Sequence, residues 1–279
     1  MTPKVAIIAP GKMGAGVARR LTDNQVTVLT VLAGRSAASA ERAASAGMRA
    51  VSERELAEAD FLLSIMPPGE ALGLARRLAP LLAAANKKPV YVDCNAVNTQ
   101  TALAIADTIA ATGCRFADAA IVGPPPKPGT SNTKFYASGP ATKDFARLNE
   151  HGLIVRVLAG DLTAASALKM AYAGITKGFT ALGAAMMLAA DRAGIDAALK
   201  AELAESRPGL LDYLTRQVPG MYGKAYRWVA ELDEIAAFVG KERPEHAMLA
   251  AAARFYETVA HDFTAEKTEI AALDRFIGK

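Results

Sequence analysis

The sequence predicts an α/β protein in which a doubly wound, mostly parallel sheet is followed by an all-helical domain. Strand-like and helix-like segments alternate as far as residue 160, which is typical of a parallel sheet with helices on both faces. From Gly160 onward no strand pattern recurs, and residues 162–193 form a helix pattern long enough to be the spine of a second domain. We therefore expect domains at residues 1–160 and 161–279, joined by a long interdomain helix.

Composition excludes several classes of protein. The chain has 279 residues, of which 52% are hydrophobic and 22% charged, as in a globular protein with a large core. Its lysines and arginines are spread out, so the net charge of +4 predicts no nucleic-acid partner. The longest apolar run, residues 181–190, is short of the roughly 20 residues that span a membrane. Two cysteines without metal-ligand spacing predict a reducing, cytoplasmic location and no metal site.

The first strand, turn and helix predict a phosphate-binding turn. Residues 5–9 form a short β-branched apolar run that stops at Pro10-Gly11, and a helix of small residues follows. Ala9, Gly11 and Gly14 occupy the positions of the G-x-G-x-x-G fingerprint, in which the helix N-terminus faces a pyrophosphate. An ordinary strand–turn–helix is the alternative. The predicted cofactor-binding turn comprises Pro10, Gly11, Lys12, Met13 and Gly14.

The loop after the second strand predicts which dinucleotide binds. Residues 26–32 read as a buried strand that ends in Ala33-Gly34-Arg35-Ser36. An acidic residue here would bind the ribose 2′-hydroxyl of NAD, and none is present. Arg35 and Ser36 can instead bind a 2′-phosphate, which predicts NADP. A solvated loop arginine is the alternative.

The remaining elements follow in order. Further strands are expected at residues 48–51, 60–65, 89–93, 115–122, 134–138 and 153–158, and helices at residues 37–46, 70–85, 99–112 and 141–150. Met66, Pro67 and Asn95 follow strand ends, where open α/β sheets bind ligands. The proline-rich residues 123–129 predict a rigid loop at the sheet edge, and Pro208, Pro219 and Pro244 predict interruptions in the helical half.

One face of the long helix carries residues that could perform chemistry. Lys169, Tyr172, Ala173 and Thr176 recur at helical spacing and share this face. A lysine among apolar residues is costly to bury without a partner or a function, so Lys169 is a candidate general acid/base. A surface lysine whose ammonium reaches water is the alternative. Lys177 is offset from this face and is expected to be a surface lysine whose ammonium reaches water.

Several segments together resemble a known family. They are Gly11-Lys12-Met13-Gly14, Arg35-Ser36, Ile65-Met66-Pro67-Pro68, Val92-Asp93-Cys94-Asn95, residues 118–123 and residues 160–169. In this order they resemble the β-hydroxyacid dehydrogenase family, which also includes 6-phosphogluconate dehydrogenase and the imine reductases. The helical half, with Tyr226-Arg227-Trp228 and residues 231–235, resembles a less characterised branch.

The resemblance implies a Rossmann domain followed by a helical domain that commonly dimerises, and we therefore expect a homodimer through the helical domain. It also implies an active site between the domains, in which the family's lysine falls on Lys169. The phosphate-binding turn falls on Gly11 to Gly14, and the nicotinamide-side loops fall on Met66-Pro67 and Asn95.

Departures from the family pattern bear on the substrate. The family's substrate-binding Ser-Gly-Gly reads Val122-Gly123-Pro124, and its asparagine one turn after the lysine reads Ala173. The best match to its C-terminal Lys-Asp pair is Asp233-Glu234. These changes weaken the binding of a small hydroxyacid carboxylate and favour a bulkier or less acidic small-molecule carbonyl, alcohol or imine.

We therefore predict an NADP-dependent oxidoreductase that transfers a hydride between NADP(H) and a carbonyl or alcohol. Lys169 is the predicted proton donor or acceptor, and Tyr172 a second hydrogen-bond donor. The alternatives are an imine reductase, and a non-catalytic NADP-binding sensor that has lost turnover.

Overall fold

The structure is a computed structural model that describes residues 2–129 and 132–279. The chain divides into two compact units, Met1–Lys169 and Met170–Lys279. The division falls inside one long helix, α7 (Ala164–Arg192), and each unit is described by itself.

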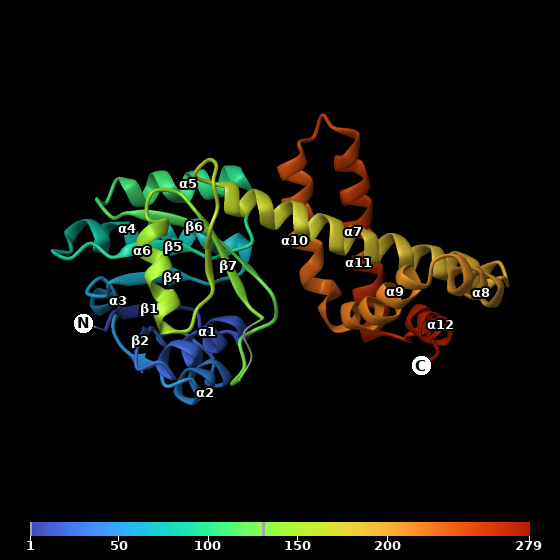
Figure 1. Ribbon diagram of the computed structural model, residues 1–279, viewed down its shortest axis with the longest axis horizontal. Helices are drawn as coiled ribbons and strands as arrows, with labels where there is room; N and C mark the ends of the chain where they lie inside the picture. The colour runs from blue at the N-terminus through green and yellow to red at the C-terminus, as the bar shows by residue number, and fades with distance from the viewer. Residues whose placement is uncertain (1, 130–131) are drawn as a thin grey trace. The chain divides into compact units, whose positions relative to one another are not determined.

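Within the described residues, eight strands of the first unit form one sheet in the order β3-β2-β1-β4-β5-β6-β7-β8 (Figure 1). They are β1 (Lys4–Ile8), β2 (Thr27–Thr30), β3 (Arg49–Ala50), β4 (Phe61–Ser64), β5 (Val90–Asp93), β6 (Phe116–Val122), β7 (Lys134–Ser138) and β8 (Val155–Val157). Neighbouring strands run parallel except β6 and β7, which are antiparallel. The predicted doubly wound, mostly parallel sheet is thus confirmed.

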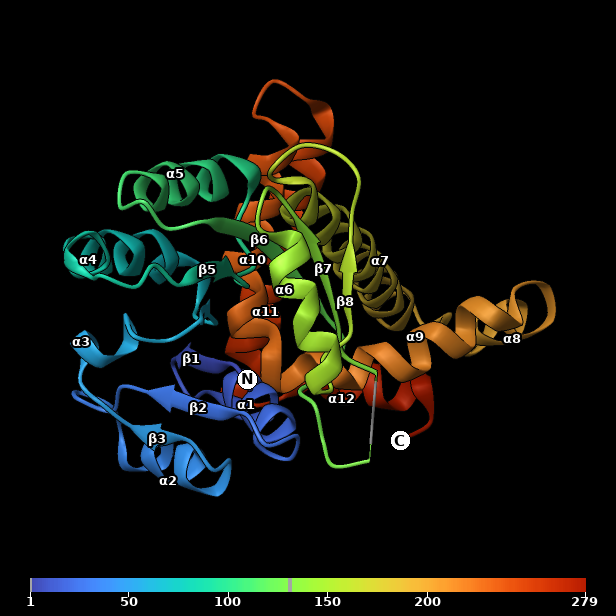
Figure 2. The ribbon, with the colours of Figure 1, turned by 60° about the vertical axis from the view of Figure 1, so that its left-hand side comes forward.

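Helices cover both faces of this sheet (Figure 2). They are α1 (Lys12–Thr22), α2 (Ala37–Ser45), α3 (Glu53–Leu56), α4 (Ala71–Ala84), α5 (Thr99–Ala110) and α6 (Thr142–Ala146). Val5 and Ile7 of β1 pack in one apolar core with α1, α2 and α6, whereas Ala6 and Ile8 pack in a second core with α3, α4 and α5. Because both faces are buried, the strand is a continuous apolar run rather than an alternating one.

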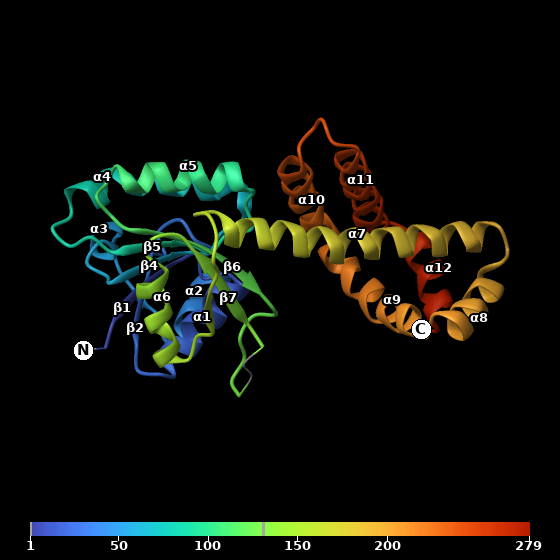
Figure 3. The same cartoon turned by 45° about the horizontal axis from the view of Figure 1, so that its top comes forward.

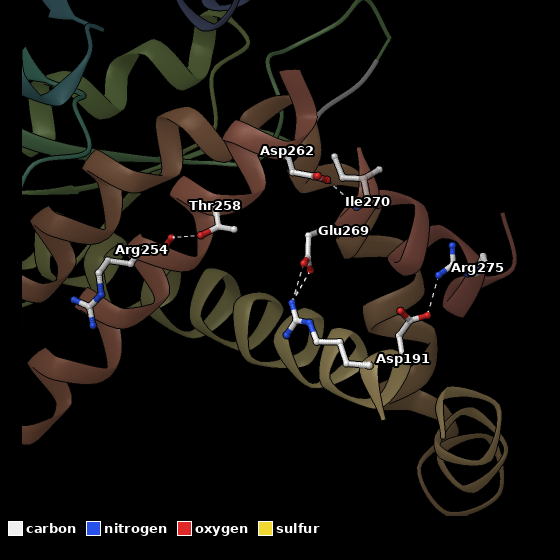
Figure 4. A network of polar contacts seen from close by, with 8 residues as sticks. Asp191, Arg254, Thr258, Asp262, Glu269, Ile270 and Arg275 are labelled. Carbon is white, nitrogen blue, oxygen red and sulfur yellow. Dashed lines mark hydrogen bonds and ion pairs between the residues drawn. The ribbon is translucent and has the colours of Figure 1, made fainter. Parts of the chain in front are cut away.

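The second unit is helical in its described residues, as predicted. Beyond α7 it contains α8 (Asp196–Ser206), α9 (Pro208–Met221), α10 (Ala225–Val239), α11 (Pro244–Thr264) and α12 (Thr268–Ile277). Helices α10 and α11 form a hairpin that packs side by side (Figure 3). Ion pairs from Arg192 to Glu269 (2.8 Å) and from Arg275 to Asp191 (2.9 Å) tie the end of α7 to α12 (Figure 4).

The predicted helix breaks are confirmed at two prolines and wrong at the third. Pro208 and Pro244 are the first residues of α9 and α11, where a missing N–H costs nothing. Pro219 lies inside α9, which continues to Met221. The proline removes one hydrogen bond, but Val218 and Met221 are buried and hold this last turn in place.

The predicted helix at residues 141–150 is also shorter than expected. Its α-helical part is α6, and a 3₁₀ segment, η2 (Arg147–His151), completes it. Gly152 then reverses the chain in the left-handed conformation, with φ of +85°. The change from α-helix to 3₁₀ helix and the turn at Gly152 lead the chain into β8.

Helix α7 is, among the described residues, long and apolar enough to cross a membrane by length and composition alone. Long core helices of water-soluble proteins have the same properties, and 39% of its most apolar window is buried within the structure. The predictions of no membrane partner and of a cytoplasmic location therefore stay predictions.

Candidate functional site

The predicted phosphate turn is built as the fingerprint requires, with one strained residue. Ala9 adopts φ of +66°, the left-handed conformation that normally selects glycine. The Gly11 N–H donates to the Ala9 carbonyl at 2.8 Å, which closes the turn. A Cβ on Gly14 would lie 2.4 Å from the Ala9 oxygen, so only glycine fits there.

The helix that follows this turn presents free N–H groups. Gly11 is the N-cap of α1 and has no side chain to cap the helix, and the first turn contains no acidic residue. Space beside Gly11 is open, since no atom lies within 4 Å of a Cβ built there. Pro10, Gly11, Lys12, Met13 and Gly14 thus surround an uncapped, positive helix end that fits a pyrophosphate.

Ala9 gives the first testable prediction. We expect Ala9→Gly to raise the free energy of unfolding by about 1 kcal/mol, because left-handed alanine is strained. Ala15→Gly, the same change inside α1, is the matched control and should lower it by about 1 kcal/mol. Urea unfolding of the three proteins measures both effects. A loss of stability in Ala9→Gly would contradict the strained-turn interpretation.

The loop after β2 places Arg35 and Ser36 at the surface. Both residues are exposed, and Gly34 before them is left-handed, with φ of +72°. The Ser36 hydroxyl caps α2 by accepting the Ser39 N–H at 3.3 Å. Arg35 and Ser36 are therefore available at the start of α2, as predicted for residues that bind a 2′-phosphate.

Two residues that the sequence did not single out support this loop. Arg42 donates from Nε to the Pro10 carbonyl at 3.0 Å and from Nη2 to the Ser39 hydroxyl at 2.9 Å. Ser39 and Arg42 lie one turn apart on α2, so their contact is predictable from the sequence. The contact between Arg42 and Pro10 is not predictable in this way, because the two residues are 32 positions apart. Arg42 thus links the predicted phosphate turn to the first turn of α2, next to Arg35 and Ser36.

A pocket of about 300 Å³ opens beside Arg35. Its lining includes Ile8, Val31, Ala33, Arg35, Val51, Ser52, Glu53 and Arg77. Glu53 and Arg77 form an ion pair within this lining. A lining that combines apolar side chains from the ends of β1 and β2 with polar groups suits a planar heterocycle such as adenine. Glu53 and Arg77 were missed because they are 24 residues apart.

Met66 and Asn95 meet at the carboxyl edge of the sheet, as expected for residues that follow adjacent strands. The Met66 N–H donates to Asn95 Oδ1 at 2.5 Å, and Asn95 Nδ2 donates to the Ser64 hydroxyl at 2.8 Å. Pro67 follows Met66 and caps a 3₁₀ turn. Buried Asn95 therefore holds the predicted nicotinamide-side loop against the ends of β4 and β5.

Two buried aspartates lie side by side below this loop. Asp93 on β5 is the register partner of Asp118 on β6, and both are fully buried. Burial, with a further contribution from Asp118, raises the pKa of Asp93 to about 8. Burial also raises the pKa of Asp118 to about 6, although hydrogen bonds from Ser166 and Ser138 oppose that rise. Burial and the neighbouring carboxyl therefore favour the protonated form of Asp93, whereas the hydrogen bonds from Ser166 and Ser138 favour the ionised form of Asp118.

This pair predicts a pH dependence of stability. A carboxyl whose pKa is raised in the folded state stabilises the protein at low pH, and this stabilisation is lost as the pH rises through the folded pKa. We expect Asp93→Asn, which is neutral at every pH, to avoid that loss, so its stability relative to wild type should increase by about 1–2 kcal/mol between pH 6 and 8. Urea unfolding at several pH values measures the difference, to which Asp118 contributes in both proteins. A difference that does not change with pH would contradict the raised pKa.

Lys169 reaches the same edge of the sheet from α7. Its Nζ donates to the Ile121 carbonyl at 2.7 Å, beside Val122 at the end of β6. Since β6 runs parallel to β5, this end lies at the edge where Asn95 and the phosphate turn also lie. The structure thus brings Lys169 to the end of β6, next to predicted substrate residue Val122.

Gly123 and Pro124 begin the proline-rich loop. Gly123 has φ of +125°, and a Cβ there would lie 2.6 Å from the Asn132 carbonyl, so glycine is required. The Pro124 carbonyl accepts a hydrogen bond from Thr133 across the loop. Farther along, Arg20 donates to the Lys127 carbonyl at 3.2 Å, which anchors the loop on α1. Thr130 and Ser131 of this loop lie outside the described residues.

Tyr172 and Ala173 lie one turn beyond Lys169 on α7, in the second unit. Ala173 is buried and Tyr172 is 51% exposed. Their predicted roles in catalysis and substrate binding stay predictions. The prediction that Lys177 is a surface lysine is wrong, because Lys177 is buried and paired with Glu231, and its ammonium lies 5.6 Å from the Trp228 ring centre.

Comparisons with known proteins agree with this geometry. Residues 4–151 match the family described as the NAD binding domain of 6-phosphogluconate dehydrogenase. Residues 190–259 match a domain of unknown function, DUF1932. No curated protein matches the chain by sequence.

Among solved structures, the chain is similar to conserved protein MTH1747, whose structure resembles 3-hydroxyacid dehydrogenases (26% identity, 97% of this chain and 99% of that one, TM-score 0.74). It is also similar to 3-hydroxyisobutyrate dehydrogenase from Mycobacterium tuberculosis with L-serine (20% identity, covering 95% of this chain and 98% of that one, TM-score 0.72). A third similar structure is a variant of the imine reductase from Myxococcus stipitatus with NAD⁺ (20% identity, covering 99% of this chain and 100% of that one, TM-score 0.59). The fold is that of the hydroxyacid dehydrogenases and imine reductases.

Proposed function

The chain belongs to the family of the NAD binding domain of 6-phosphogluconate dehydrogenase, and on this premise we propose that it is an NADP-dependent oxidoreductase. Its substrate is a carbonyl compound or the corresponding alcohol. The observation that carries the proposal is the position of Lys169, whose Nζ is held 2.7 Å from the Ile121 carbonyl at the carboxyl end of β6. Ligands of open α/β sheets bind outside that edge.

The residues present fit a dinucleotide phosphate. The open space at Gly11 and the uncapped start of α1 suit its pyrophosphate. The pocket beside Arg35 suits its adenine, and Arg35 and Ser36 suit its 2′-phosphate. An acidic residue that would repel this phosphate is absent between Ala33 and Ser36. These features support NADP over NAD.

Lys169 performs the proton transfer in this proposal. When bound, NADPH supplies the hydride to the carbonyl carbon. In its ammonium form Lys169 donates a proton to the carbonyl oxygen, which yields the alcohol, and in the reverse direction the neutral amine accepts that proton. The Ile121 carbonyl accepts a hydrogen bond from the ammonium and holds it at the end of β6. Tyr172 is proposed as a second donor.

The residues near Lys169 favour a substrate that is not a small acid. Val122 has no side-chain donor for a carboxylate, and Pro124 has neither a side-chain donor nor a backbone N–H group. Ala173 likewise cannot donate from its side chain. We therefore propose a bulkier or less acidic carbonyl compound, bound in part by Val122, Gly123, Pro124 and Ala173.

A panel assay tests the proposal. NADPH or NADH absorbance is followed with ketones, aldehydes and cyclic imines for reduction, and with hydroxyacids and alcohols for oxidation. We expect turnover with NADPH and at least one apolar carbonyl compound. Turnover confined to imines would favour an imine reductase, for which the same proton donor would serve. NADP(H) binding without turnover on any member would favour a non-catalytic sensor.

The exposed side of α7 supports a homodimer through the helical domain. Apart from Tyr172, which is proposed above as a donor to the substrate, its large exposed apolar side chains are Leu168, Ile175, Phe179, Leu182 and Met186. They are spaced seven, four, three and four residues apart, as in the seam of a helix that packs on another helix. A second copy of α7 offers the same seam, and two copies related by a two-fold axis would cover each other. We propose a second copy of this chain as the partner.

A charge in this seam should separate the dimer. We expect Ile175→Glu to convert the protein to monomers at micromolar concentration, because each copy loses an apolar contact worth about 1.5–3 kcal/mol and buries a charge. Met248→Glu on α11 is the matched control, since Met248 is 71% exposed and Ile175 73%. Sedimentation velocity distinguishes the species. A wild-type protein that sediments as a monomer would contradict the dimer.

A further inference from the structure

The start of α7 is capped by the sheet rather than by its own N-terminal residues. The Ser166 N–H donates to Asp118 Oδ2 at 2.7 Å, and the Ser166 hydroxyl donates to Asp118 Oδ1 at 2.8 Å. The Ala165 N–H donates to the Ser138 hydroxyl at 2.9 Å. Asp118 and Ser138 are register partners on β6 and β7. Two strands therefore satisfy helical N–H groups that a local cap would otherwise satisfy.

The same strand also contacts the lysine. Asp118 and Ile121 are three residues apart on β6, and their partners on α7, Ser166 and Lys169, are also three residues apart. One strand thus holds α7 at two successive points. The first point involves a buried carboxylate at the positive end of the helix, where a negative charge is stabilising. The second is the hydrogen bond to the Lys169 ammonium.

We infer that Asp118 is a positioning residue for Lys169, which sets the height and rotation of the first turns of α7 so that the ammonium reaches the end of β6. This inference rests on the proposed function, in which Lys169 transfers the proton. Asp118 acts only through the helix, since its two oxygens are occupied by Ser166 and it is fully buried. A small displacement of a catalytic group is enough to reduce turnover strongly.

Asp118→Asn with Asp60→Asn as control tests the inference. Asp60 precedes β4, at the opposite end of that strand from Ser64, and like Asp118 its carboxylate accepts a backbone N–H, that of Lys4 at 2.8 Å. Asparagine keeps the shape of aspartate and loses one acceptor and the charge. We expect Asp118→Asn to lower kcat by about 10- to 100-fold with little change in NADPH affinity, and Asp60→Asn to leave kcat within a few-fold of wild type. Equal losses in both variants would overturn the inference.

A double-mutant cycle separates positioning from general destabilisation. If Asp118 acts through Lys169, Asp118→Asn should not further reduce the residual turnover of Lys169→Ala. Multiplicative losses would indicate an independent role and overturn the inference. Ser166→Ala, which removes only the bond to Oδ1, should give a smaller loss in the same direction. This milder variant keeps the test available if Asp118→Asn fails to fold.

A measurement that does not depend on turnover tests the position of Lys169 independently of the proposed function. Acylation of lysines by acetic acid N-hydroxysuccinimide ester, read by mass spectrometry, reports the environment of Lys169, with exposed Lys241 as internal reference. We expect the relative labelling rate of Lys169 to change in Asp118→Asn and not in Asp60→Asn. An unchanged rate would overturn the positioning role. Full turnover of Lys169→Ala would instead overturn the proposed function and leave this labelling result to decide the position of the lysine.

Discussion

Replacing Lys169 with alanine is expected to lower kcat by about 10²- to 10⁴-fold, the range that a positioned general acid or base contributes. Affinity for NADPH should change little, because the residues proposed to bind it lie at α1, at the loop after β2 and at the ends of β4 and β5. Steady-state kinetics with the best substrate of the panel, together with NADPH fluorescence titration, measure the two quantities separately.

Two further variants sharpen this result. Lys169→Arg keeps a cation that can donate to the Ile121 carbonyl, but a guanidinium does not release its proton near neutral pH. It should therefore fail to restore turnover, whereas a merely structural lysine would be replaced well by arginine. Lys241→Ala, at an exposed position, is the control for an unspecific effect of lysine removal. Turnover of Lys169→Ala equal to wild type would refute the assignment.

Local sequence patterns predicted the architecture well because each element is determined by nearby residues. The apolar runs became buried strands, and the long apolar segment became α7. Pro219 shows the limit of this approach, since a proline predicts a break only where packing does not hold the turn. The antiparallel direction of β7 was not predicted, because direction depends on how the residues between β6 and β7 return the chain.

The sequence could predict those parts of the candidate site that depend on neighbouring residues in the chain. The phosphate turn and the lysine both follow from local motifs, although the positive φ of Ala9 is visible only in three dimensions. Contacts that join distant segments could not be derived. Arg42 meets Pro10, and Ser166 meets Asp118 across 48 residues. An aspartate inside the apolar run of β6 was nevertheless a signal, because a buried carboxylate requires partners.

The second large effect concerns the choice of cofactor. We expect Arg35→Ala to weaken NADPH binding by about 10- to 100-fold, since hydrogen bonds between charged groups contribute about 1.5–3 kcal/mol each. NADH lacks the 2′-phosphate, so its affinity should change by less than about threefold. Fluorescence titration of both cofactors gives the ratio of the two dissociation constants. A ratio equal to that of wild type would refute the NADP assignment.

Arg42→Ala distinguishes direct phosphate binding from support of the loop. Its guanidinium donates to the Pro10 carbonyl and to the Ser39 hydroxyl, so it joins the phosphate turn to α2. Loss of this link should weaken NADPH and NADH by similar factors, because both share the pyrophosphate that the turn binds. Arg147→Ala, on the exposed η2 segment, should alter neither affinity. Selectivity would then reside in Arg35, whose proposed partner, the 2′-phosphate, is present in only one of the two cofactors, while affinity for both would depend on the turn that Arg42 holds in place.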